Sequence, residues 1–189
     1  SPEIGAKVEC YDHTEEMVWR HLNVFEHKCE VRCELPRGKC LQSGKVYRVR
    51  PPWEGLSKHF TQSFEAMALL LMREMSVSAA GRMMKEHDTR MWRILKAHVE
   101  VAYRQTDWSE VISVGCDELS ARKGHRYVSV FCDLIGKRVM FATKGKDKSV
   151  WKAFAEALEA HNGHPRAIKE ISMDMSPAYI SGAKANIGS

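Results

Sequence analysis

The hydrophobic positions of this 189-residue chain follow three different periodicities along its length. Over residues 8–53 they fall in brief alternating runs, a period of two that predicts short β-strands. Over residues 61–105 the spacing becomes helical, and from residue 111 onward strand-like runs return with one helical stretch among them. The changes of pattern at Pro51-Pro52 and Thr106-Asp107 mark the predicted boundaries.

The middle stretch first predicts two helices in succession. The apolar stripe of the first helix would consist of Phe64, Met67, Leu70 and Leu71. Ser76 is a suitable N-cap for a shorter second helix through Met84, because its hydroxyl can accept a hydrogen bond from the first helical turn. A turn is predicted at Glu86-His87-Asp88.

A third helix is expected to begin with Thr89 as its N-cap. Its apolar face would consist of Trp92, Leu95, Val99 and Ala102. The sequence of helices matches a helix-turn-helix domain, in which the last helix enters the major groove of DNA. The residues that would then face DNA are Arg90, Arg93 and Lys96. A small helical bundle whose basic residues only form a solvated face is the alternative.

The last stretch predicts a mixed sheet. Residues 111–116, 127–134 and 137–143 are expected to form three strands, with Gly136 in the turn of a hairpin. Residues 147–161 predict a helix, and residues 167–173 a fourth strand. Together with the front end, this makes an α+β chain of several modules.

Composition restricts the class of protein. A hydrophobic content of 44% with 28% charged residues is typical of a globular protein rather than a disordered one. Basic residues exceed acidic ones by 29 to 24, which permits attraction to polyanions. No apolar run approaches the roughly 18 residues of a membrane span, and six dispersed cysteines suit a reducing compartment. We therefore expect a cytoplasmic protein with no membrane partner.

Two aspartates are candidates for metal-dependent chemistry. Asp117 follows the first predicted strand of the sheet and Asp174 the fourth, so pairing of these strands would bring both carboxylates to one edge. Such carboxylates can hold Mg²⁺ or Mn²⁺ for phosphodiester chemistry. The alternative is a structural role, because Ser176-Pro177 resembles the start of a helix that Asp174 would precede.

The front end contains candidate zinc ligands, namely Cys10, His13, Cys29, Cys33 and Cys40. Structural zinc sites need two close ligand pairs around a tetrahedral ion. Along a strand, Cys29 and Cys33 would share one face but lie about 13 Å apart. We expect no bound zinc.

Several motifs, taken in order, resemble the transposases of the ISL-three insertion-sequence family. They are Trp19-Arg20-His21-Leu22-Asn23, Glu86-His87-Asp88-Thr89-Arg90-Met91-Trp92, Gly115-Cys116-Asp117-Glu118, Arg122-Lys123-Gly124-His125-Arg126-Tyr127, Asp133-Leu134 and Ser172-Met173-Asp174-Met175-Ser176-Pro177-Ala178-Tyr179. The resemblance implies a ribonuclease-H-like catalytic domain in which Asp117 and Asp174 are the first two catalytic, metal-ligating acids. The third acid of that family, a glutamate, has no counterpart before Ser189, which predicts a C-terminal truncation. Lys123 and Arg126 are further candidates for DNA phosphate contacts.

The family front end resembles a zinc ribbon, but Ser43 stands where a ligand after Cys40 is expected. The predicted modules are a degenerate zinc-ribbon-like segment (1–53), a helix-turn-helix domain (54–106) and part of a DDE catalytic domain (107–189). The resemblance implies binding of double-stranded insertion-sequence terminal repeats, in the bacterial nucleoid, with metal-dependent cleavage and strand transfer. A catalytically inactive DNA-binding remnant or inhibitor, and a relic without a role, are the alternatives; a homo-oligomer is left open.

Overall fold

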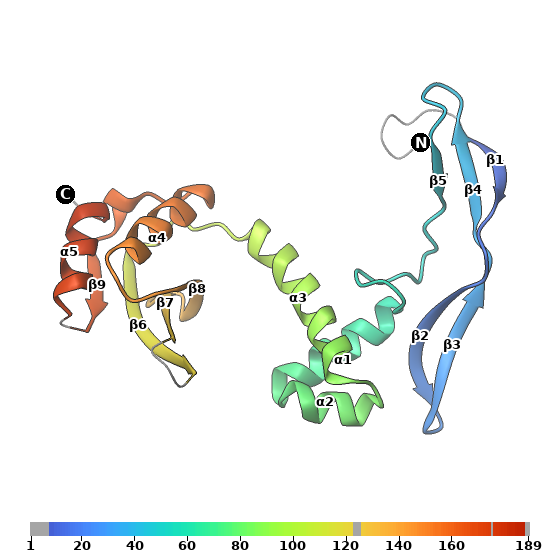
Figure 1. The fold of residues 1–189 in the computed structure, drawn as a ribbon, viewed down its shortest axis with the longest axis horizontal. Coiled ribbons are helices and arrows are strands. Elements are labelled where there is room, and N and C mark those ends of the chain that lie inside the picture. The colour runs from blue at the N-terminus through green and yellow to red at the C-terminus, as the bar shows by residue number, and fades with distance from the viewer. Residues whose placement is uncertain (1–7, 123–125, 175, 188–189) are drawn as a thin grey trace. The chain divides into compact units, whose positions relative to one another are not determined.

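The computed structural model describes residues 8–122, 126–174 and 176–187, and the chain divides into two compact units (Figure 1). Unit 1 is Ser1–Ala102 and unit 2 is Tyr103–Ser189. Both combine strands and helices, so the expected α+β class is confirmed. No helix within the described ranges is long and apolar enough to cross a membrane.

Unit 1 begins with two small antiparallel sheets, as the alternating pattern predicts. The first sheet has the order β1-β4-β5 and the second is the β2–β3 hairpin. Their strands are β1 (Val8–His13), β2 (Met17–Val24), β3 (His27–Cys33), β4 (Pro36–Cys40) and β5 (Val46–Arg48). Cys29 and Cys33 are both half-buried. They lie on the same side of β3, because every second side chain of a strand points to the same face.

Three helices complete unit 1: α1 (Gln62–Glu74), α2 (Val77–Met84) and α3 (Asp88–Gln105). Ser76 is the N-cap of α2 and accepts a hydrogen bond from the Ala79 amide, which confirms that prediction. The prediction that Thr89 caps α3 is wrong, since α3 already begins at Asp88. His87 precedes the helix, and its Nδ1 accepts a hydrogen bond from the Thr89 amide, as a capping side chain does.

The apolar faces predicted for α1 and α3 are rotated about the helix axis relative to the faces that are buried in the structure. The core of unit 1 contains Phe60, Phe64, Ala68, Ala80, Met84, Met91 and Ile94. On α1, Phe64 and Leu71 pack as expected, but Met67 and Leu70 are exposed. On α3, Met91 and Ile94 are buried while Trp92 and Val99 are exposed. Both helices carry apolar residues on two faces, so periodicity alone chose the wrong one.

Unit 2 is a four-stranded mixed sheet covered on one face by helices. Its strand order is β8-β7-β6-β9, with β6, β7 and β8 antiparallel and β9 parallel to β6. The elements are β6 (Ser113–Arg122), β7 (Arg126–Asp133), β8 (Arg138–Lys144), α4 (Ser149–Ala160), the 3-10 turn η1 (Pro165–Ala167), β9 (Glu170–Met173) and α5 (Pro177–Asn186). The four predicted strands and the predicted helix are all present, with shifted ends.

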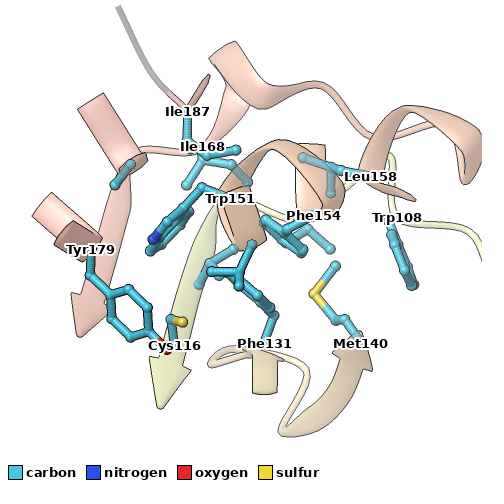
Figure 2. Close-up of a cluster of buried hydrophobic side chains, with 14 residues drawn as sticks. Trp108, Cys116, Phe131, Met140, Trp151, Phe154, Leu158, Ile168, Tyr179 and Ile187 are labelled. Atoms are coloured by element: carbon cyan, nitrogen blue, oxygen red, sulfur yellow. The ribbon is translucent and has the colours of Figure 1, made fainter. Parts of the chain in front are cut away.

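Aromatic packing holds the helices on the sheet. Figure 2 shows Trp151 and Phe154 of α4 directed toward Phe131 of β7, with Tyr179 of α5 beside Cys116 of β6. The rings of Phe131 and Phe154 stack at 4.3 Å, and Trp151 meets Phe131 edge-on at 5.1 Å. This core occupies one face of the sheet and leaves the candidate aspartates to the other.

Candidate metal site and DNA-binding face

Strand register brings Asp117 and Asp174 to matching positions on neighbouring strands. In the parallel pairing of β6 with β9, Cys116 is opposite Met173. Each aspartate is the next residue along its chain, and neighbouring strands lie about 4.8 Å apart. The strands β6 and β9 therefore pair as the sequence predicts, although Asp117 lies within β6 and not at its end.

Alternation along the strands points Asp117 away from the helices. Val114 and Cys116 of β6 belong to the helix-covered core, so Gly115, Asp117 and Leu119 face the other side. On that side an open pocket of about 420 Å³ is lined by both aspartates together with Gly115, Leu119, Val130, Cys132, Leu134 and Ser172 among others. Both aspartates are exposed and belong to one concave surface.

The face beneath the aspartates is held by a buried polar contact. The hydroxyl groups of Ser129 on β7 and Tyr179 on α5 lie 2.5 Å apart, and Ser129 also donates to the Gly145 carbonyl at 2.8 Å. Burial raises the pKa of the Tyr179 hydroxyl, opposed by its hydrogen bond to Ser129. This contact joins α5 to β7.

The other acidic residues near the strands have structural positions. Asp133 is buried and accepts hydrogen bonds from the amides of Ile135 and Gly136 and from Arg138, so it stabilises the turn between β7 and β8. Glu118 is next to Asp117 but alternates to the helix side, half-buried. Among the residues that the structure describes, no three His, Cys, Asp or Glu side chains gather in a metal-binding group.

The chemistry of the aspartate pair nevertheless suits a hard divalent cation. Two exposed carboxylates on adjacent strands offer the oxygen ligands that Mg²⁺ and Mn²⁺ prefer, and Mg²⁺ keeps several waters when only one or two carboxylates bind it. The sheet supplies the rigid support that such a site needs. The residues present thus fit an ion that retains much of its hydration shell.

The first turns of α3 present an exposed face of mixed character. Thr89, Trp92, Arg93 and Lys96 have the spacing i, i+3, i+4 and i+7, so they share one side of the helix, and all four are exposed. Trp92 is 56% exposed, although its size suggested a core position. The sequence pattern did not identify Thr89 and Trp92 as residues of the exposed face of α3. The alternative helical phase, in which Met91 and Ile94 are buried, was the signal that could have identified them.

The predicted basic residues of α3 differ in their contacts. Arg90 is partly buried, pairs with Glu86 at 2.7 Å and stacks over the Phe60 ring at 4.5 Å. Arg93 is exposed and donates to the Lys58 carbonyl at 3.3 Å. Lys96 is also exposed, with its side chain 79% accessible and Glu100 3.8 Å away. Arg93 also lies over the Phe60 ring, at 5.5 Å. Arg93 and Lys96 are exposed to a ligand, whereas Arg90 is partly buried against unit 1.

The remaining candidate residues are those predicted to contact DNA phosphates near the end of β6 and those predicted as zinc ligands in the front end. Lys123 and the side chain of Arg126 lie outside the described residues. Of the zinc candidates, Cys10 and His13 are on β1, Cys29 and Cys33 on β3, and Cys40 is buried on β4. They are divided between two sheets, and over residues 8–122, 126–174 and 176–187 no set of three comes together.

A helix-turn-helix domain joined to a mixed sheet with paired aspartates is typical of a transposase, and comparison with known proteins agrees. The family model "Helix-turn-helix domain of transposase family ISL3" matches residues 57–99. The DDE-type model of the same family, described as "Transposase", matches residues 114–189. The chain belongs to the transposase family ISL3.

Curated relatives extend the likeness to the front end. The transposase for insertion sequence element IS1001 of Bordetella parapertussis is 28% identical over 177 residues, which are 94% of this chain and 43% of that protein. The transposase for IS1557 of Mycobacterium tuberculosis is 27% identical over 176 residues, covering 90% of this chain and 38% of the relative. The chain thus spans less than half the length of these relatives. No solved structure matches it significantly.

Proposed function

We propose that this chain carries the DNA-recognition domain and the first two metal-ligating acids of an insertion-sequence transposase. The observation that carries the proposal is the parallel register of Cys116 with Met173, which sets Asp117 and Asp174 side by side. The strand order β8-β7-β6-β9, with only β9 parallel to β6, supports assigning unit 2 to the first part of a ribonuclease-H-like fold.

Asp117 and Asp174 would hold the cation and position it against a DNA phosphate in the pocket. Mg²⁺ or Mn²⁺ bound there would help to activate an attacking oxygen and to stabilise the leaving oxygen of a phosphodiester. Neither aspartate needs to accept or donate a proton in this role. The protein contributes position, because β6 and β9 are hydrogen-bonded neighbours that keep the two carboxylates in a fixed relation.

DNA recognition would fall to α3. The residues of a recognition helix that contact base edges lie in its N-terminal part, where Trp92, Arg93 and Lys96 share an exposed face. Arg93 can contact guanine edges and Lys96 a phosphate, while Trp92 offers apolar contact with a thymine methyl group. The proposed target is the double-stranded terminal repeat of an insertion sequence.

A second candidate function is DNA binding without cleavage. It is favoured because, in the described part of unit 2, no third acidic side chain joins Asp117 and Asp174 in a metal-binding group. A chain of this kind would occupy insertion-sequence ends and compete with a complete transposase.

Selection of duplexes from a random pool by the purified chain, followed by incubation with Mg²⁺ or Mn²⁺, separates the two functions. Nicking that is lost in Asp117→Asn and Asp174→Asn, and kept in the control Glu156→Gln, supports metal-dependent cleavage. Glu156 is exposed on α4, so its substitution removes the same charge elsewhere in unit 2. Specific binding without nicking supports the second function, and failure to enrich any duplex overturns both.

A further inference from the structure

We propose that Phe25, at the tip of the β2–β3 hairpin, is a second DNA-contacting element that wedges against a base step flanking the site bound by α3. The inference rests on the proposed function, since it assumes that α3 enters the groove of a duplex. It concerns residues outside the matched helix-turn-helix region 57–99. Three features of the hairpin carry it: its anchoring, the location of its tip and the state of Phe25.

The hairpin is anchored on the helical domain by a buried arginine. Arg20 of β2 is 4% exposed, and its Nε donates to Glu86 Oε1 at 3.2 Å in the α2–α3 turn. Its Nη2 donates to the Met84 carbonyl at 3.1 Å, and Nη1 to the Cys29 carbonyl of β3 at 3.2 Å. One guanidinium therefore joins both strands of the hairpin to the end of α2.

A second contact fixes the tip itself. The pair Val24–His27 closes a two-residue loop formed by Phe25 and Glu26. Lys85, the C-cap of α2, donates to the Glu26 carbonyl at 2.6 Å and pairs with its carboxylate at 3.1 Å. Since α3 begins three residues after Lys85, the tip lies beside the entry to the recognition helix. In Figure 1 the closed end of the hairpin is next to the α2–α3 turn.

Phe25 has an energetically unfavourable backbone conformation, and its side chain is exposed to solvent. It is 91% exposed, with a φ of +46°, and Glu26 follows with a φ of +67°. A two-residue turn with both angles positive favours Asn-Gly, and a bulky residue there is strained. Strained residues on rigid supports concentrate at ligand-binding positions. An aromatic ring that is 91% exposed is available to a partner.

Duplex DNA suits this tip better than a protein partner. Phenylalanine is one of the apolar side chains that enter base steps from the minor groove and partly unstack them. The exposed Lys28 follows the ring along β3, where its positive charge can meet an adjacent phosphate. The tip is fixed beside the helix that would occupy the major groove, so both elements can engage one duplex at neighbouring positions.

The test uses the full chain and 40-bp duplexes enriched from a random pool, with 2-aminopurine placed at successive flanking positions. The variants are Phe25→Ala, Phe25→Asn and Phe25→Trp, with Tyr11→Ala as the control, because Tyr11 is an exposed aromatic residue on β1. We expect the wild-type chain to raise 2-aminopurine fluorescence at one flanking step. Phe25→Ala and Phe25→Asn should lose that signal and bind about tenfold more weakly, whereas Phe25→Trp should retain both.

Phe25→Asn also separates binding from folding, because asparagine tolerates a positive φ better than phenylalanine. Its Tm should be equal to or higher than that of the wild type while DNA binding falls. Equal affinity and equal fluorescence for wild type and Phe25→Asn would overturn the proposal. Sedimentation of the two proteins without DNA tests the alternative that Phe25 contacts a second copy of the chain, and a loss of self-association in Phe25→Asn without a change in DNA affinity would also overturn it. Failure of the wild type to enrich any duplex would instead overturn the proposed function on which the inference rests.

Discussion

Arg20 and Glu86, 66 residues apart in the sequence, form an ion pair in which both side chains are almost fully buried. Glu86 uses its second oxygen to pair with Arg90 at 2.7 Å. The front-end hairpin is thus joined to the helix-turn-helix by charge as well as by hydrogen bonds to backbone carbonyls. A buried charge left without its partner is strongly destabilising.

We therefore expect Arg20→Met to lower the free energy of unfolding of unit 1 by about 3 kcal/mol, because Glu86 keeps only Arg90 as an ionic partner and the carbonyls of Cys29 and Met84 lose their donor. Urea unfolding followed by tryptophan fluorescence measures the loss. The control is Arg32→Met, since Arg32 is exposed on the adjacent strand and pairs with Glu30 at the surface; its substitution should be nearly neutral, because exposed ion pairs contribute little to stability. Equal effects of the two substitutions would contradict the anchoring role of Arg20.

Glu65 of α1 makes a second buried connection. Its carboxylate accepts hydrogen bonds from the amides of Leu56 and Ser57 at 2.8 and 2.6 Å, and His98 Nε2 of α3 lies 2.8 Å away. Glu65→Ala leaves two amides and an imidazole without this acceptor, so we expect a loss of about 2–4 kcal/mol. Glu74→Ala at the exposed end of α1 should be nearly neutral in the same unfolding assay. A small effect of Glu65→Ala would show that water replaces the carboxylate.

The exposed face of α3 makes a prediction about salt dependence. Lys96→Ala should weaken binding of specific and random duplexes alike and reduce the slope of log K against log salt by about one, as expected for a phosphate contact. Arg93→Ala should instead reduce discrimination between the selected duplex and random DNA. Lys152→Ala, an exposed cation on α4 in unit 2, is the control for charge. An unchanged salt slope in Lys96→Ala would exclude Lys96 from the interface.

A pH effect is expected just before α4. Hydrogen bonds from the hydroxyl and amide of Ser149 hold the pKa of Asp147 below its ordinary value. A lowered folded-state pKa adds stability above the ordinary aspartate pKa of about 3.9, and that contribution disappears as the pH falls through the folded-state value. Carboxyl NMR titration should find the Asp147 midpoint below that of a free aspartate, and Ser149→Ala should raise it. An unshifted midpoint would contradict the hydrogen bonds from Ser149 to Asp147.

Local features of the fold were predictable from sequence, whereas long-range ones were not. The Ser76 cap and the Asp133 turn depend on residues within three positions, so their chemistry is visible in the sequence. The buried face of α3 depends on what it packs against, and both Trp92 and Met91 suit a core. The roles of Arg20 and Glu65 depend on partners tens of residues away.

The candidate site was predictable in part for the same reason. The sequence pattern predicts strands that lead to Asp117 and to Asp174. In the structure these strands, β6 and β9, pair in parallel. The length of β6 could not be predicted, because Glu118 and Ser120 are polar and this segment is extended through its pairing with β7. The tip of the β2–β3 hairpin gave no signal, since Phe25-Glu26 lacks the Asn-Gly sequence typical of such a turn.

The most direct test of the central claim is binding of Mn²⁺ to the purified chain, measured by electron paramagnetic resonance of the free ion. We expect a site that is lost in both Asp117→Asn and Asp174→Asn and retained in Glu156→Gln, because the two neighbouring carboxylates are needed together. Binding that survives either aspartate substitution, or that falls equally in the Glu156 control, would contradict the assignment of Asp117 and Asp174 as a metal-ligating pair.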